Sequence, residues 1–240
     1  MILTGGEGIE KGSLPEMSGR LNGKKVLITQ SETFMGPALT AAFTKEGASV
    51  LADDGDLTGE GAAEALVERA GEIDVLIANL AALNPRVPTV DVDDATFEGL
   101  FRAMVMPLHG LVRAVLPQMT ERQTGKIVVM GSASPMRGQP RAAAYAAARG
   151  AQLGYVKSVA VEVARHNVQI NAIAQNFVDN PVYFPKDYQE TDAFKARLKD
   201  VPARRLGTPE EDAMLAVFLA SDECNFLIGQ AIPFAGGWVQ

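Results

Sequence analysis

The chain has little of what metal centres and disulfide frameworks need. Its 240 residues include one cysteine, Cys224, and two histidines, His109 and His166, far apart in the sequence. A single thiol cannot form an intramolecular disulfide, and two distant histidines do not supply the ligands of a metal site. We therefore expect no metal, a buried apolar environment for Cys224, and ordinary packing or partial exposure for His109.

Excess positive charge and long apolar runs are also lacking. Lysine and arginine number 22 against 29 acidic residues, a net charge of -7, which disfavours nucleic-acid and anionic-membrane partners. No apolar run approaches the ~20 residues that cross a bilayer, and no signal-peptide segment is evident. We expect a cytoplasmic protein with a flexible leader at residues 1–17, where Met17 offers a second start, and one domain at residues 18–240.

What the sequence does contain is an alternation of apolar strands and amphipathic helices. Strands are predicted at residues 24–29, 49–52, 74–79, 126–131 and 168–174 and in the final QAIPFAGG, and helices at 36–46, 62–71, 94–121, 141–164 and 209–221. This alternation predicts an α/β fold, a single-domain Rossmann-like doubly wound parallel sheet flanked by helices, which we interpret as a seven-strand βα pattern.

Local signals refine the helix boundaries. Pro107 and Pro117 lie within the helical pattern of residues 94–121 and are expected to kink or end it. Thr208 before Pro209 is the expected N-cap of the last helix. The segment with Asn180, Pro181 and Pro185 is predicted to be irregular.

A hydroxyl, a phenol and a guanidinium follow the fourth predicted strand. Ser132 comes directly after it, and Tyr145 and Arg149 lie four residues apart, on one face of the next helix. A neighbouring cation favours the phenolate and makes a phenol a better base. Such a pair alone is better explained as a helix-surface contact, but its placement beside a serine loop after a strand favours deprotonation of an alcohol.

These residues resemble the short-chain dehydrogenase/reductase superfamily. The resemblance covers nearly everything after the leader, through VQINAIA, RRLGTPEEDA, FLASDECNFLIGQ and FAGG. It implies a site at the carboxyl ends of the strands. It also implies a homotetramer built through the long helices at residues 94–121 and 141–164.

The sequence departs from that superfamily where a dinucleotide would bind. Gln30 and Phe34 stand where members have two glycines of the phosphate loop, and Gly36 remains. Arg149 replaces the usual lysine, and the region after the second strand is shortened by about a strand and a helix. We interpret Asp53 as a solvated turn residue rather than a ribose ligand. We therefore expect no nucleotide cofactor.

Two paired signatures are similar to those of halohydrin dehalogenases, a branch of the superfamily. The first is Thr29, Phe34 and Gly36, and the second is Ser132, Tyr145 and Arg149. The resemblance implies cofactor-independent conversion of a vicinal halohydrin to an epoxide and halide, and epoxide opening by small anions such as azide, cyanide or nitrite.

The same resemblance implies a halide and substrate pocket. The halide would lie against Phe34 and the segment Gln175, Asn176, Phe177 and Val178, with Asn176 and backbone amides as donors. Weaker candidates for the substrate wall are Ser134, Pro135, Met136, Ala142, Tyr183 and Phe184. Plain loop packing is an equal alternative for Tyr183 and Phe184.

Two other functions stay open. An atypical NAD(P)-dependent reductase would use Ser132 and Tyr145 equally well, whereas a non-catalytic scaffold would have no need of the complete Ser/Tyr/Arg set. Trp238 either caps a neighbouring subunit's pocket or packs within its own chain.

Overall fold

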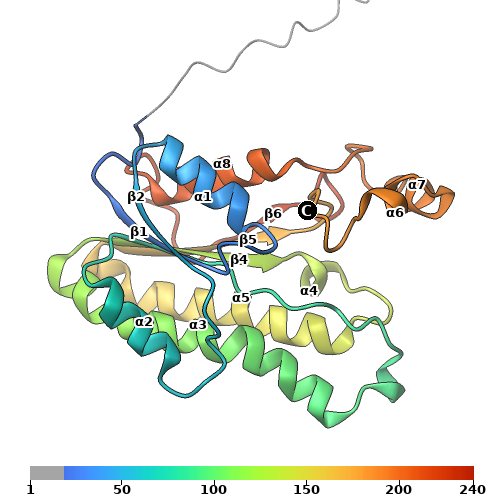
Figure 1. Cartoon of the computed structure of the whole chain (residues 1–240), viewed down its shortest axis with the longest axis horizontal. Coiled ribbons are helices and arrows are strands. Elements are labelled where there is room, and N and C mark those ends of the chain that lie inside the picture. The colour runs from blue at the N-terminus through green and yellow to red at the C-terminus, as the bar shows by residue number, and fades with distance from the viewer. Residues whose placement is uncertain (1–18) are drawn as a thin grey trace, which may run out of the picture.

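The computed structural model describes residues 19–240, so the expected leader lies outside the described residues. Figure 1 shows a central parallel sheet with helices on both faces. The strands follow the order β2-β1-β3-β4-β5-β6. Their bounds are Lys25–Thr29 for β1, Ser49–Asp53 for β2, Val75–Ala78 for β3, Gly125–Ser132 for β4, Val168–Gln175 for β5 and Ala231–Phe234 for β6.

The predicted Rossmann-like single domain is confirmed, but the interpretation as seven strands was wrong. The described chain forms six, because the segment between β2 and β3 holds one helix, α2 (Ala62–Ala70), and no further strand. Asp53 is the last residue of β2 rather than a solvated turn residue. Its carboxylate accepts from Arg69 at 2.7 Å and from the Gly55 N–H at 3.0 Å.

The two faces of the sheet are covered by different helices. α1 (Gly36–Lys45) and α8 (Pro209–Ala220) lie on one face, and α2, α3 (Asp94–Arg122) and α5 (Ala143–Val163) on the other (Figure 1). Strands enclosed on both faces are apolar throughout. All eight residues of β4 are accordingly buried.

The helix ends follow their capping residues, whereas two internal prolines do not break their helix. Thr208 caps α8 as predicted, since its Oγ1 accepts from the Glu211 N–H at 3.1 Å. Pro107 and Pro117 were expected to kink or end their helix. The prediction of an end was wrong, because α3 continues through both residues. Packing of a long apolar stripe outweighs the loss of single backbone hydrogen bonds.

α3 is also long and apolar enough to cross a membrane by length and composition, with a mean hydropathy of 1.3 over 18 residues. This corrects the expectation that no segment approaches that length. Such a helix is weak evidence for a membrane span, because core helices meet the same criteria. Here α3 packs against α2 and α5.

The chain between β5 and α8 contains structure that the sequence analysis missed. The segment predicted to be irregular forms two short helices, α6 (Lys186–Gln189) and α7 (Asp192–Leu198). Its apolar side chains form a cluster with Phe177 and Trp238, whose rings lie 5.9 Å apart. Trp238 thus packs within its own chain. The cluster covers the carboxyl end of β5, where the site lies.

Candidate active site

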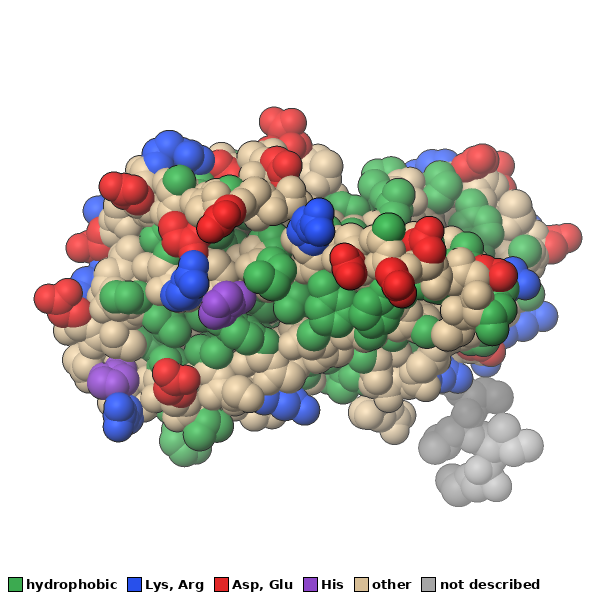
Figure 2. Space-filling view, turned by 90° about the horizontal axis from the view of Figure 1, so that it is seen from below, with side chains coloured by type: hydrophobic (Ala, Val, Ile, Leu, Met, Phe, Trp, Pro, Cys, Tyr) green, Lys and Arg blue, Asp and Glu red, His purple; other side chains and the backbone are tan. Residues whose placement is uncertain are grey.

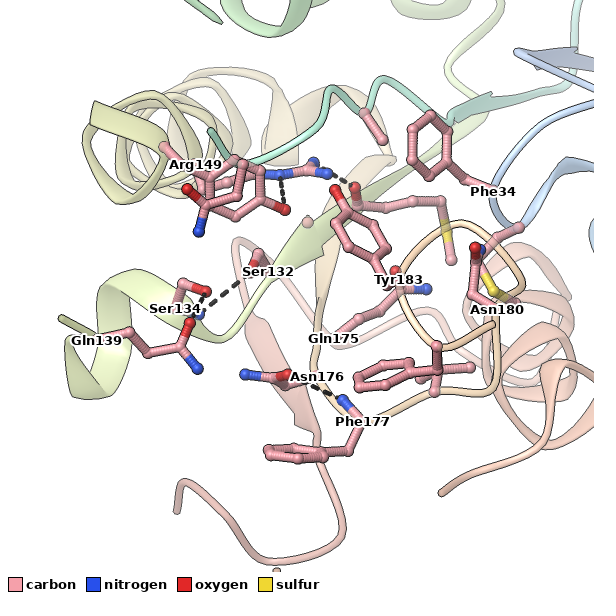
Figure 3. A pocket seen from close by; sticks show the side chains of 18 of the residues that line it. Phe34, Ser132, Ser134, Gln139, Arg149, Gln175, Asn176, Phe177, Asn180 and Tyr183 are labelled. Carbon is pink, nitrogen blue, oxygen red and sulfur yellow. Dashed lines mark hydrogen bonds between the residues drawn. The ribbon is translucent and has the colours of Figure 1, made fainter. Parts of the chain in front are cut away.

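A cavity of about 90 Å³ lies at the carboxyl edge of the sheet. Figure 3 shows it from close by. Ser132 at the end of β4 and Tyr145 and Arg149 on α5 line it, together with Phe34 from the loop after β1. Side chains far apart in the sequence meet there because parallel strands end at one edge.

Tyr145 and Arg149 form a buried hydrogen-bonded pair. The Arg149 Nε donates to the Tyr145 hydroxyl oxygen at 3.0 Å. The Arg149 Nη1 lies 3.0 Å from the carbonyl oxygens of both Leu80 and Met130 and 2.9 Å from the Gln152 Oε1. These acceptors fix the guanidinium beside the phenol, and the Arg149 residue is only 3% exposed.

The charge of Arg149 favours the phenolate form of Tyr145. Burial is the largest influence on the pKa of Tyr145 and opposes ionisation. The charge of Arg149, together with hydrogen bonds from Tyr183, Arg149 and Ser132, outweighs burial, so that the pKa of Tyr145 lies below its usual value. Tyr145 is therefore placed to act as a base, and its lowered pKa favours that role.

The Ser132 hydroxyl can donate a hydrogen bond to the substrate oxygen from which Tyr145 would take a proton. Its Oγ accepts from the Ser134 N–H at 3.1 Å, which fixes the oxygen. When a substrate binds, the hydroxyl proton can turn from Tyr145 to the substrate oxygen. Ser132 and Tyr145 can therefore hold one oxygen atom between a donor and a base.

The segment Gln175–Val178 follows β5 and lines the cavity. The backbone amides of Asn176 and Phe177 are not the free donors that we expected. The Asn176 N–H donates to the Phe234 carbonyl at 3.0 Å, and the Phe177 N–H donates to the Asn176 Oδ1 at 2.9 Å. Among the described residues, the Asn176 Nδ2 group has no hydrogen-bond acceptor, so this side chain, unlike the amides of Asn176 and Phe177, is a donor left for a ligand.

A buried carboxyl lies behind this segment. The Gln175 Nε2 donates to the Asp212 Oδ2, and Asp212 is fully buried on α8. The Asp212 Oδ1 has no partner in the described part of the chain. Burial raises the pKa of Asp212 to about 7, although the bond from Gln175 lowers it. The sequence analysis gave no role to this residue.

The loop after β1 is closed by its own residues. Gln30 makes paired bonds with Ala81, from its Nε2 to the carbonyl at 3.1 Å and from the Ala81 N–H to its Oε1 at 2.8 Å. The Phe34 ring lies 5.7 Å from the Tyr183 ring. A Cβ on Gly36 would lie 2.1 Å from the Gln30 carbonyl oxygen, so that close packing there requires glycine.

Three successive backbone amides of this loop are also occupied. The N–H groups of Ser31 and Thr33 donate to the carbonyls of Asp53 at 3.1 Å and Gln30 at 3.3 Å. The Glu32 N–H donates to the Asp54 carboxylate at 3.3 Å. A pyrophosphate needs such amides as donors, and Asp54 would repel it. This loop therefore does not fit a dinucleotide.

Tyr183 joins two segments over the cavity. Its hydroxyl donates to the Ala82 carbonyl at 2.8 Å. Burial, and secondarily the neighbouring Tyr145, raise the pKa of Tyr183, so it stays protonated and remains a donor. Figure 3 shows its ring pointing into the cavity beside Phe34.

The cavity brings together most of the candidate residues but not all. Pro135, Met136 and Ala142 do not line it, because the short helix α4 (Ser134–Arg137) and the turn after it carry them away. Lining residues that the sequence analysis did not single out for a ligand are Met35, Asn79, Ala81, Asn84, Arg86, Met130, Gly131, Gln139, Asn180 and Arg197. No local motif marks them, since they meet only through the fold.

The fold and this site define an α/β enzyme on a Rossmann-like sheet. A family profile described as enoyl-(acyl carrier protein) reductase matches residues 22–239. The 3-oxoacyl-(acyl-carrier-protein) reductase of Thermotoga maritima is 30% identical, over 92% of this chain and 99% of that protein. The dehydrogenase/reductase SDR family member 6 of Danio rerio is 31% identical over the same shares of the two chains.

Two solved structures extend the comparison. One described as a dehalogenation enzyme has a TM-score of 0.83 and 31% identity, over 91% of this chain and 99% of its own. A levodione reductase has a TM-score of 0.84 and 25% identity, over 90% and 98%. The chain belongs to the short-chain dehydrogenase/reductase superfamily.

Proposed function

We propose that this enzyme converts vicinal halohydrins to epoxides and halide without a nucleotide, and catalyses the reverse opening of epoxides by small anions. The observation that carries the proposal is the Tyr145–Arg149 pair beside a phosphate loop that is closed by Gln30, Phe34 and Asp54. The similarity to a dehalogenation enzyme at 31% identity supports it.

The reaction begins with the substrate hydroxyl between Ser132 and Tyr145. Ser132 donates a hydrogen bond to the substrate oxygen, and the Tyr145 phenolate takes its proton. The oxygen attacks the neighbouring carbon, a C–O bond forms, and the C–halogen bond breaks with its electron pair leaving on the halide. Because nucleophile and electrophile belong to one molecule, the cavity need only hold the productive rotamer.

The leaving halide lies against Gln175–Val178. The free Asn176 Nδ2 donates to it, while Phe34 and Phe177 provide apolar walls around the anion. Donors fixed before the reaction stabilise the developing charge without reorganisation. The proton accepted by Tyr145 then passes to solvent.

A NAD(P)-dependent reductase is the second candidate, favoured by the curated relatives, which are oxidoreductases. It would use Ser132 and Tyr145 in the same way. A fluorescence titration with NADH and NADPH separates the two functions. Tight binding together with nucleotide-dependent turnover favours the reductase.

Halide release from a simple bromohydrin, with nucleotide omitted, tests the proposal. Wild-type protein is expected to release bromide and acid in equal amounts, and Tyr145→Phe to lose this activity at unchanged thermal stability. Turnover retained by Tyr145→Phe refutes the role of Tyr145. No halide from wild-type protein over a broad halohydrin panel refutes the function.

We also propose that the enzyme acts as a homotetramer built through α3 and α5. Phe97 and Met106 on α3 and Val161 on α5 are exposed large apolar residues. Figure 2 shows hydrophobic side chains gathered on this face of the molecule. Sedimentation analysis tests this association, and a monomer at micromolar concentration would contradict it.

A further inference from the structure

The charges that line the cavity differ from those of the whole chain. The protein has 29 acidic and 22 basic residues, yet the lining includes Arg86, Arg149 and Arg197 and no aspartate or glutamate. Charge of one sign in a cleft concentrates ligands of the opposite sign. Dehalogenation of an uncharged halohydrin needs Arg149 beside the Tyr145 phenolate. It gives no role to Arg86 and Arg197.

Arg197 is held at the cavity wall by aromatic rings. Its guanidinium carbon lies 5.2 Å from the centre of the Phe177 ring and 5.7 Å from that of Phe184. Two of the carboxylates nearby in the sequence are paired elsewhere, Asp179 with Lys186 at 3.7 Å and Asp192 with Lys195 at 3.4 Å. Within residues 19–240, Arg197 forms no ion pair.

Arg86 approaches from another segment. It lies in the loop between β3 and α3, where its N–H donates to the Asn84 Oδ1 at 3.1 Å. The bond between the Tyr183 hydroxyl and the Ala82 carbonyl ties this loop to the segment that leads to Arg197. Arg86 likewise has no acidic partner in the described part of the chain. Two unpaired guanidinium groups from different segments thus border one small cavity.

We propose that the natural substrate is a halohydrin that carries a carboxylate, which Arg86 and Arg197 bind while Ser132 and Tyr145 hold its hydroxyl. This inference rests on the proposed function and deepens it. A planar guanidinium presents paired N–H donors that match the two oxygens of a carboxylate, a match that a spherical halide does not offer. The product would be an epoxy carboxylate.

A matched pair of substrates tests the assignment. γ-Chloro-β-hydroxybutanoate and its neutral amide, γ-chloro-β-hydroxybutyramide, share the reacting carbons and differ in the remote charge. Wild-type enzyme is expected to show a kcat/KM about tenfold or more higher for the carboxylate, because charge-assisted hydrogen bonds are stronger than neutral ones. Added salt should reduce that advantage and leave the amide unaffected.

Arginine variants locate the charge recognition. Arg86→Gln and Arg197→Gln should each lower kcat/KM about tenfold for the carboxylate, mainly through KM, with little change for the amide. Arg197→Lys should retain part of the preference. Arg165→Gln is the matched control, because Arg165 lies in the 3₁₀ helix after α5, away from the cavity, and changes the net charge equally.

The outcomes separate this inference from the proposed function. Equal losses for both substrates, or a wild-type enzyme that does not prefer the carboxylate, overturn the inference while halide release from the amide upholds the dehalogenation. Absence of halide release from both substrates and from a simple bromohydrin overturns both. A selective loss for the carboxylate in both arginine variants supports the inference.

Discussion

Replacing Arg149 by methionine should shift the acid limb of the pH–rate profile upward. Rate rises with pH as Tyr145 loses its proton, and the guanidinium favours that loss through an Nε–Oη contact of 3.0 Å. Two charges about 4 Å apart interact by about 4 kcal/mol at an effective dielectric constant of about 20. Loss of the guanidinium removes a stabilisation of the phenolate of up to about that size, so the pKa that sets the acid limb rises.

Arg149→Lys provides the companion variant. Lysine keeps the charge but has no fork of donors for the Leu80 and Met130 carbonyls, so its profile should shift by less than that of methionine. Tyrosinate absorption titrated against pH measures the ionisation directly, and halide release measures its effect on rate. An unchanged acid limb in a folded Arg149→Met protein would refute the argument that charge tunes Tyr145.

Two further predictions concern Phe34, in the cavity wall, and Asp212, which lies behind the segment 175–178. Phe34→Ala should raise the bromide inhibition constant about tenfold without creating NADPH affinity in a fluorescence titration, since the amides of Ser31 and Thr33 stay bonded; tight NADPH binding would contradict this. Asp212 has a pKa of about 7 when folded against about 3.9 unfolded. The native state therefore holds the extra proton between these values, and stability falls as pH rises through that window by up to about 4 kcal/mol. Asp212→Asn should remove this decline in denaturant unfolding, and an identical pH dependence in the variant would exclude Asp212 as its source.

The order of strands and helices could be predicted because the spacing of apolar residues along the sequence differs between the two. β4 contains the apolar run of residues 127–130, and nearly all residues of β4 and β5 are buried because both faces of the sheet are covered. α6 and α7 were missed because prolines and polar residues dominate that segment. Thr191, whose side chain accepts from the Phe194 N–H, was the N-cap signal that marks α7.

The central chemistry of the site could also be predicted, because Tyr145 and Arg149 are neighbours on one helix. Contacts between distant segments could not. The bond from Gln175 to Asp212 spans two elements and leaves no local pattern. Pro135 and Met136 follow Ser132 closely, yet one turn of helix directs them away from the cavity.

In the loop after β1, two residues other than glycine have the left-handed backbone conformation that glycine adopts most easily. Gln30 and Phe34 have φ angles of 46° and 52°, each costing about 1–2 kcal/mol for a residue with a Cβ. Glycine would follow the same path with less strain. Glycine and these larger residues can therefore exchange at either position one at a time while the loop keeps the same backbone path.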